Sequence, residues 1–216
     1  MPSTRDPSAL PAVDDLRRLC QSLAMLDAIL SPEWEYRYHS FDSRWNDGQE
    51  MASLRDGCGN SYFFLFSSVG AILKGFVRDS EVWRNVVNRN QPISGLFDDV
   101  PAEFVGFLTE PAFSIPESTF CLWRRRSDPT WQTGKVDSLQ GEDPDGSGEL
   151  LRLLDGNPEA YRLWAEDYYE TSIEREAVEQ VMAYRPLTAE LVRLLNPELS
   201  LIDLEEELAE IAYPTS

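Results

Sequence analysis

The chain has 216 residues, 42% of them apolar and 11% aromatic, so it can bury a core without a structural metal ion or a disulfide framework. It carries 19 basic and 38 acidic residues, and the resulting net charge of −19 repels phosphate backbones and anionic lipid headgroups. We therefore expect neither nucleic acid nor a membrane as a partner. The chain shows no membrane-length apolar run and no signal-peptide pattern at its start, which predicts a cytoplasmic protein.

The acidic residues are unevenly distributed. Residues 1–141 hold 19 acidic and 14 basic side chains, whereas residues 142–216 hold 19 acidic and only 5 basic ones, a net charge of −14. We expect one domain over 1–216, with a possible subdivision into a helix plus β-sheet (14–141) and an acidic helical part (142–216). The three cysteines, Cys20, Cys58 and Cys121, are widely spaced and are predicted to be free thiols.

The first elements show two clear periodicities. Asp14 opens a segment whose apolar residues recur at helical spacing until Ser31 and Pro32, which predicts an amphipathic helix. The following residues 33–39 alternate, with Trp34 and Tyr36 on one parity and charged side chains on the other. This alternation predicts a half-buried strand.

The middle of the chain favours an antiparallel sheet. Strands are predicted at 50–55, 61–68, 71–77, 119–125 and 131–137, and short helices at 79–87 and 101–108. Because the links between the strands up to residue 77 are short, these early strands should form an antiparallel meander. The unbroken apolar run in 61–68 predicts a central strand that is covered on both faces.

From residue 149 onward the pattern is helical, with capping signals at Asn157, Thr188 and Ser200. The predicted fold is α+β: an N-terminal helix, an antiparallel sheet of about five or six strands, and a C-terminal helical layer.

His39 is the only histidine, so any histidine-dependent chemistry must use it. On a strand it would project on the same side as Glu33 and Glu35, and these three are the candidate catalytic residues. The alternative is that these side chains lie on the solvent-exposed face of a sheet, where charged residues keep the protein soluble and have no catalytic role. We favour that second interpretation, because no nucleophile motif accompanies the histidine.

Other motifs fit structural roles better than binding sites. The acidic segment 143–149 lacks the spacing of a calcium loop and is predicted to be a turn that leads into a helix. Gly57 and Gly59 precede a strand rather than a helix, so a turn explains them better than a phosphate loop. We expect no metal ion and no cofactor.

Charge suggests two contact surfaces. Arg124, Arg125 and Arg126 are predicted to dock the acidic C-terminal part onto the sheet, with Asp128 nearby. Acidic side chains of the last helix are the candidate partner-binding residues, against the alternative of a solvated helix face: Glu205, Glu206, Glu207 and Glu210.

Four segments, 32–38, 110–113, 120–134 and 155–158, together resemble a family of bacterial proteins of about this length that has no assigned activity. The similarity would run from Leu26 to Pro214. By size and charge alone, the chain is also similar to immunity proteins that neutralise toxins, and this analogy implies no functional residue.

The sequence thus favours a non-enzymatic acidic protein that binds a basic protein partner. The alternative is a small-molecule-binding protein or a hydrolase-type enzyme that uses His39 in an aromatic pocket, with candidate wall residues Trp34, Tyr36, Trp123 and Trp131. The sequence does not predict an oligomeric state, although a structural subunit of a homo-oligomer is a third possibility, and it would show an exposed apolar patch.

Overall fold

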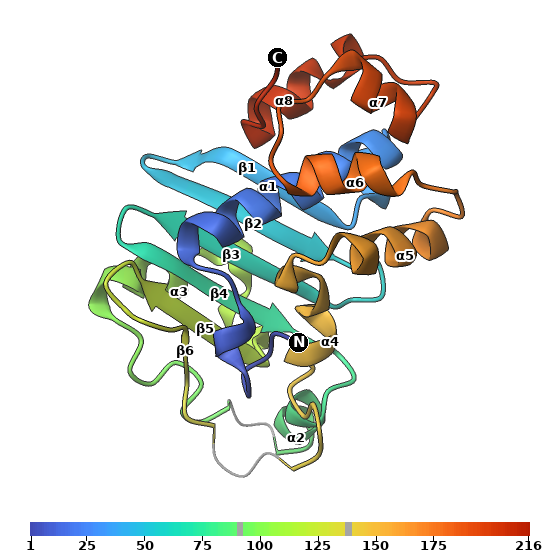
Figure 1. Ribbon diagram of the computed structural model, residues 1–216. Helices are drawn as coiled ribbons and strands as arrows, with labels where there is room; N and C mark the ends of the chain where they lie inside the picture. Colours follow the sequence, from blue (N-terminus) through green and yellow to red (C-terminus); the bar gives the residue numbers. More distant parts are fainter. Residues whose placement is uncertain (90–92, 137–139) are drawn as a thin grey trace.

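The structure is a computed structural model, and it describes residues 1–89, 93–136 and 140–216, without the side chains of 87–89. It confirms the predicted α+β fold (Figure 1). Helix α1 precedes the sheet and spans Val13–Leu30. The strands are β1 (His39–Asn46), β2 (Gln49–Arg55), β3 (Ser61–Ser67), β4 (Gly70–Phe76), β5 (Phe120–Arg125) and β6 (Gln132–Thr133). Between β4 and β5 lie α2 (Glu81–Arg89) and α3 (Val105–Leu108).

The six strands follow one another across the sheet in chain order, and every neighbouring pair is antiparallel. The predicted meander is therefore confirmed from β2 to β4, where the links are too short for parallel neighbours. Strand β5 also pairs antiparallel with β4, although the long segment with α2 and α3 lies between them. Helix α1 and the C-terminal helices lie on one face of the sheet, while α3 lies on the other (Figure 1).

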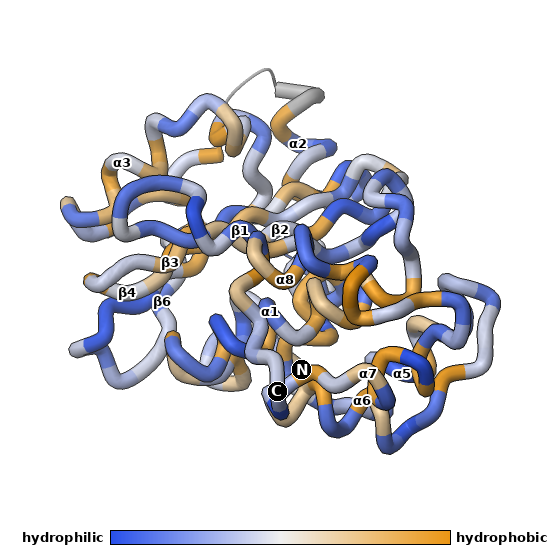
Figure 2. The backbone as a smooth tube through the Cα atoms, turned by 90° about the horizontal axis from the view of Figure 1, so that it is seen from above, coloured by the Kyte–Doolittle hydropathy of each residue, from blue (hydrophilic) through white to orange (hydrophobic). Residues whose placement is uncertain are grey.

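Strand β3 is central and contributes to two cores. Tyr62, Phe64 and Phe66 pack on the side of α1 and the C-terminal helices. Phe63 and Leu65 pack on the opposite side, against apolar residues of the segment that contains α3. Side chains of a strand alternate between the faces, so an unbroken apolar run fits this position. Hydrophobic residues recur along β3 and its neighbouring strands in the middle of the molecule (Figure 2).

The C-terminal part consists of short helices, and local caps fix where two of them begin. The Asn157 side chain accepts hydrogen bonds from the backbone N–H groups of Glu159 and Ala160, and the Thr188 side chain accepts one from Leu191. These hydrogen bonds confirm the helix starts that the sequence predicted at Asn157 and Thr188. The elements are α4 (Ser147–Leu150), α5 (Pro158–Tyr168), α6 (Arg175–Met182), α7 (Ala189–Leu195), the 3-10 turn η7 (Ile202–Leu204) and α8 (Glu205–Ile211).

The prediction of a strand at 33–39 is wrong. Trp34–Tyr36 forms the 3-10 turn η2, and β1 begins only at His39. The Arg37 guanidinium donates hydrogen bonds to the carbonyls of Ser31 and Pro32, which stabilises this turn. As a result Trp34 and Tyr36 are exposed, whereas the polar His39 is buried.

The arginine cluster does not dock the C-terminal part. Arg126 pairs with Asp14 of α1, at 2.6 Å. Arg125 lies 3.5 Å from Glu103, and Arg124 donates to the backbone carbonyls of residues 128 and 129. These partners all precede residue 142, so the three arginines stabilise the sheet half of the chain instead.

Within the described ranges, no helix has both the length and the apolar character needed to cross a membrane. The three cysteines are free, with Cys58 exposed and the other two buried. The larger of the two cores contains residues from α1, the sheet and the C-terminal helices together.

Candidate functional site

The most buried polar cluster is centred on Asp27 of α1. Its Oδ2 accepts hydrogen bonds from the backbone N–H groups of Tyr38 (3.1 Å) and His39 (2.6 Å), and it lies 2.9 Å from Nδ1 of the His39 ring. Its Oδ1 accepts a hydrogen bond from the hydroxyl of Tyr161, at 2.7 Å. The carboxylate is completely buried, yet these donors satisfy it.

Aromatic rings cover this cluster. The His39 ring lies 5.1 Å from that of Tyr38 and 5.5 Å from that of Trp164, measured between centroids. Burial and the charge of Asp27 hold the pKa of the Tyr161 hydroxyl well above its usual value. Nε2 of His39 is buried and has no hydrogen-bond partner among the described residues. An imidazole oriented by a carboxylate suits acid-base chemistry, but His39 does not line the aromatic-walled hollow beside it, which is described below.

The predicted catalytic trio is not brought together. His39 is 3% exposed, and its ring contacts Asp27 rather than a glutamate. Glu33 and Glu35 are exposed at the turn η2. The sequence analysis missed Asp27, although a signal was present: it is a charged residue in the otherwise apolar stretch 23–30.

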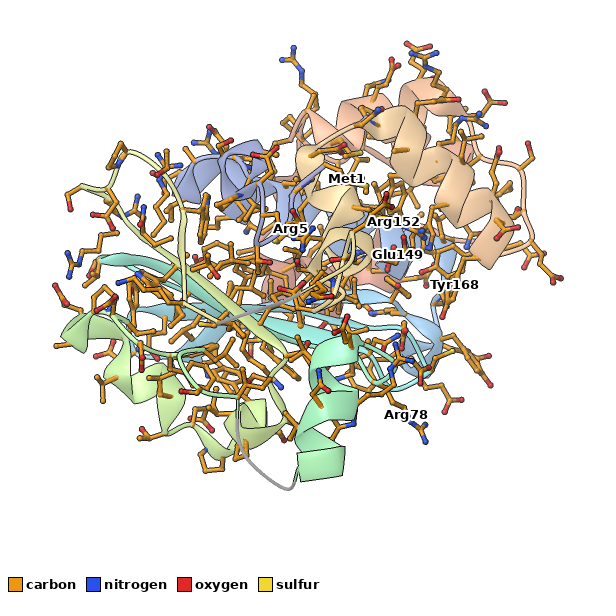
Figure 3. The ribbon with its side chains drawn as sticks, turned by 90° about the horizontal axis from the view of Figure 1, so that it is seen from below. Met1, Arg5, Arg78, Glu149, Arg152 and Tyr168 are labelled. Atoms are coloured by element: carbon orange, nitrogen blue, oxygen red, sulfur yellow. The ribbon has the colours of Figure 1, made fainter. Side chains whose placement is uncertain are left out.

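A pocket of about 420 Å³ lies beside this cluster. Its walls include the rings of Trp34, Tyr36, Tyr38 and Tyr168, which come from η2, from the residues before β1 and from α5. We call it the aromatic pocket. Trp34 and Tyr36 line it as the sequence predicted, but Trp123 and Trp131 are buried in the two cores and do not. Tyr168 lies at the molecular surface (Figure 3).

Polar groups of the aromatic pocket come mainly from β1 and β2. Ser40 and Ser53 face each other across these strands, with their hydroxyl oxygens 2.7 Å apart. The guanidinium carbon of Arg55 lies 5.6 Å from the centroid of Trp34 and 5.7 Å from that of Phe63. Arg55 thus sits between two rings in cation–π contact.

The candidate partner-binding glutamates divide into two groups on α8. Glu207 pairs with Arg37 at 2.8 Å, and both side chains are mostly buried. Glu207 therefore lies where α8 packs against the sheet. Glu210 is exposed, although partial burial and the charge of Asp42 on β1 raise its pKa.

Glu205 and Glu206 point outward and have no cationic partner in the part of the chain that the structure describes. They follow Ile202 by three and four residues, at the start of α8 and directly after the 3-10 turn η7. Ile202 is 75% exposed, the largest exposed fraction of the large apolar side chains that the structure describes. We call Ile202, Glu205 and Glu206 the α8 face.

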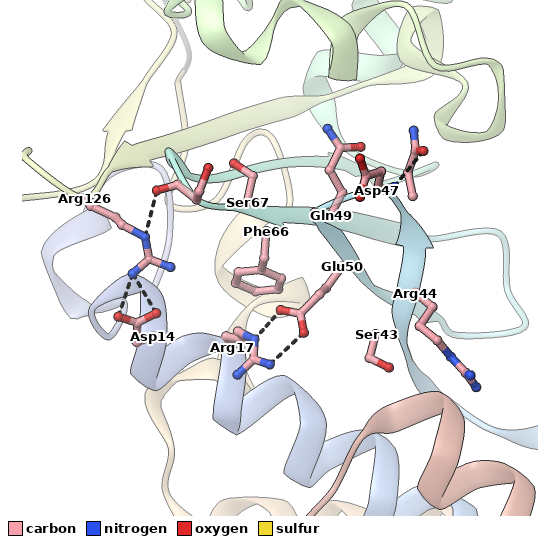
Figure 4. Close-up of a pocket in the computed structure, with 13 residues that line it drawn as sticks. Asp14, Arg17, Ser43, Arg44, Asp47, Gln49, Glu50, Phe66, Ser67 and Arg126 are labelled. Carbon is pink, nitrogen blue, oxygen red and sulfur yellow. Dashed lines mark hydrogen bonds and ion pairs between the residues drawn. The ribbon is translucent and has the colours of Figure 1, made fainter.

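A second hollow, of about 640 Å³, lies where the N-terminal half of α1 meets the β1–β2 and β3–β4 turns (Figure 4). Three arginines line it: Arg17 pairs with Glu50, Arg126 pairs with Asp14, and Arg44 donates a hydrogen bond to the backbone carbonyl of Ala209. Two of the three cations are therefore already neutralised, and the hollow has no aromatic walls except Phe66. It is a weaker candidate than the aromatic pocket.

The described residues contain no cluster of three or more side chains suited to bind a metal ion. Asp143 accepts hydrogen bonds from the backbone N–H groups of Gly148 and Glu149. It therefore caps α4, as the predicted turn into a helix implies. No family model, no curated protein and no solved structure matches this chain, so its function is argued from the site geometry alone.

Proposed function

We propose that this protein is an acidic protein-binding module that engages a basic partner through the α8 face. The observation that carries the proposal is the apolar side chain of Ile202, 75% exposed, followed closely by two exposed carboxylates, Glu205 and Glu206, that have no cationic partner among the described residues. A protein interface combines an apolar contact with a polar rim, and a basic partner would supply the missing cations.

Charge strengthens this proposal in a second way. The chain has a net charge of −19, and the C-terminal part carries most of it. Such a field speeds the encounter with a basic protein and makes the association sensitive to salt, because the Debye length falls from about 10 Å at 0.1 M to about 3 Å at 1 M. The same negative charge repels an acidic protein, so the charge of the chain favours a basic partner.

The test is a pull-down from the native cells at low salt, with the bound proteins identified by mass spectrometry. A triple variant, Ile202→Ser with Glu205→Gln and Glu206→Gln, removes the α8 face. The matched control is Glu174→Gln with Glu176→Gln, which removes two exposed charges at the start of α6. We expect wild type and control to recover the same basic protein, and the triple variant to lose it.

High salt should also release that protein from the wild type. If the triple variant retains it, or if the wild type recovers no specific basic protein, the α8 face is not the binding surface that we propose.

A further inference from the structure

We infer that the aromatic pocket is a binding site for a small planar aromatic carboxylate. This inference concerns a second site, on η2, β1, β2 and α5, and it does not depend on the proposed function of α8. Its volume of about 420 Å³ lies within the usual range for small-molecule sites, and several rings provide flat apolar walls.

The charged groups that line the pocket decide which ligand charge it accepts. Arg37 is already paired with Glu207 and with two backbone carbonyls. Glu35 is exposed at the turn η2, and its negative charge raises the pKa of the Tyr36 hydroxyl. Arg55 has ring contacts but no carboxylate within ion-pair distance among the described residues. Arg55 is therefore the cation of the lining with which a ligand carboxylate can pair.

The hydroxyl groups point to the same conclusion. Ser40 and Ser53 share one hydrogen bond, so one of the two hydroxyl protons is used between them. The other proton has no acceptor among the described residues and remains available to a ligand. The pocket thus offers a guanidinium and a hydroxyl donor, and a carboxylate accepts hydrogen bonds from both kinds of donor.

The rings determine the body of the ligand. Trp34 and Tyr36 are 57% and 58% exposed, so two large rings remain uncovered at the mouth of the pocket. Tyr38 and Tyr168 form a further wall, with ring centroids 5.4 Å apart in an edge-to-face arrangement. A planar aromatic ring can stack against these walls and gain more than an aliphatic chain of equal area, because aromatic pairs have additional favourable geometry.

The test uses three probes of equal shape, measured by isothermal titration calorimetry at physiological salt: 2-naphthoate, 2-naphthalenemethanol and 2-naphthylmethylammonium. A hydrogen bond to a charged group stabilises by about 1.5–3 kcal/mol, so we expect naphthoate to bind about 10- to 100-fold more tightly than the neutral alcohol. The ammonium probe should bind more weakly than the alcohol.

Two variants separate the parts of the pocket. Arg55→Gln should remove the preference for naphthoate over the alcohol, whereas Arg78→Gln should not. Arg78 is an exposed arginine that points away from the body of the protein (Figure 3). Trp34→Leu should weaken all three probes by a similar factor, since it removes a shared wall.

Circular dichroism of each variant confirms that it is folded before binding is measured. The inference is overturned if no probe binds, if the ammonium probe binds as tightly as naphthoate, or if Arg55→Gln keeps the preference. Binding should be unchanged in the triple variant of the α8 face, so failure of this inference is distinguishable from failure of the proposed function.

Discussion

Arg37 and Glu207 form an ion pair, at 2.8 Å, that joins the turn before β1 to the last helix. The side chains are only 8% and 20% exposed, so solvent screens this pair less than the surface pairs of the chain. Arg37 also lines the aromatic pocket, and Glu207 belongs to α8. This ion pair therefore links the aromatic pocket to α8 and contributes to the docking that the sequence had assigned to Arg124–Arg126.

We expect Glu207→Gln to lower the free energy of unfolding by about 1–2 kcal/mol, because it leaves the Arg37 guanidinium partly buried without its anion. A double-mutant cycle with Arg37→Met, measured by urea denaturation, should give a coupling energy of about 1 kcal/mol. The matched cycle is Arg152→Met with Glu149→Gln, a more exposed pair. It should give no more than about 0.5 kcal/mol, and equal coupling energies would contradict the role assigned to Arg37.

Asp27 should be the most sensitive polar residue of the chain. Asp27→Asn replaces one acceptor oxygen with a donor amide that faces the hydrogen-bond donors His39 and Tyr161. We expect a loss of about 3 kcal/mol or more in the free energy of unfolding, measured with urea. The control, Asp15→Asn, changes an exposed residue of the same helix and should cost less than about 1 kcal/mol. A small effect at Asp27 would show that the cluster is not essential to the fold.

Lys74 should make stability depend on pH in the alkaline range. Burial lowers its pKa from 10.5 to about 8 in the folded protein, and its amine lies over the ring of Phe63, 5.4 Å from the centroid. Between these two values the unfolded chain binds more protons, so the contribution of Lys74 to stability rises with pH across that window. Below about pH 8, Lys74 is protonated in both the folded and the unfolded protein. Folding must then bury the full positive charge, so the loss of stability caused by Lys74 is largest there.

Lys74→Met should therefore stabilise the protein near neutral pH, by on the order of 2 kcal/mol, and this gain should shrink as the pH rises above about 8. Urea denaturation of wild type and variant at several pH values measures the difference. Lys135→Met is the control, since Lys135 is exposed and pairs with Asp99. A gain at Lys74 that stays constant with pH would refute this account.

Gly75 of β4 should tolerate no side chain. A Cβ atom there would lie 2.0 Å from a ring atom of Phe120 on the neighbouring strand. Gly75→Ala should destabilise the protein by about 2 kcal/mol or more, because a close-packed interior has no room for the methyl group. Gly106→Ala, which meets nothing within 4 Å in α3, should be neutral or stabilising in the same thermal or urea unfolding experiment. Equal effects at the two glycines would contradict the packing seen around Phe120.

The sequence alone determined the features that depend on neighbouring residues. It predicted α1, the meander from β2 to β4, the two-sided burial of β3 and the caps at Asn157 and Thr188, because periodicity and capping act within a few residues. It failed at 33–39, where the alternation of rings and charges matched a strand. There the side chain of Arg37, within the segment itself, binds the carbonyls of Ser31 and Pro32 and stabilises a turn instead.

Only the tertiary structure decided the site. Asp27 and Tyr161 are 134 positions apart, and Arg37 and Glu207 are 170 apart, so no local pattern brings them together. These residues come together because α5 packs near α1 and α8 packs against β1. The same packing buries His39, whereas Trp34 and Tyr36 stay exposed. Acidity was evident from composition, but which carboxylates remain free for a partner depends on which ones the fold has already paired.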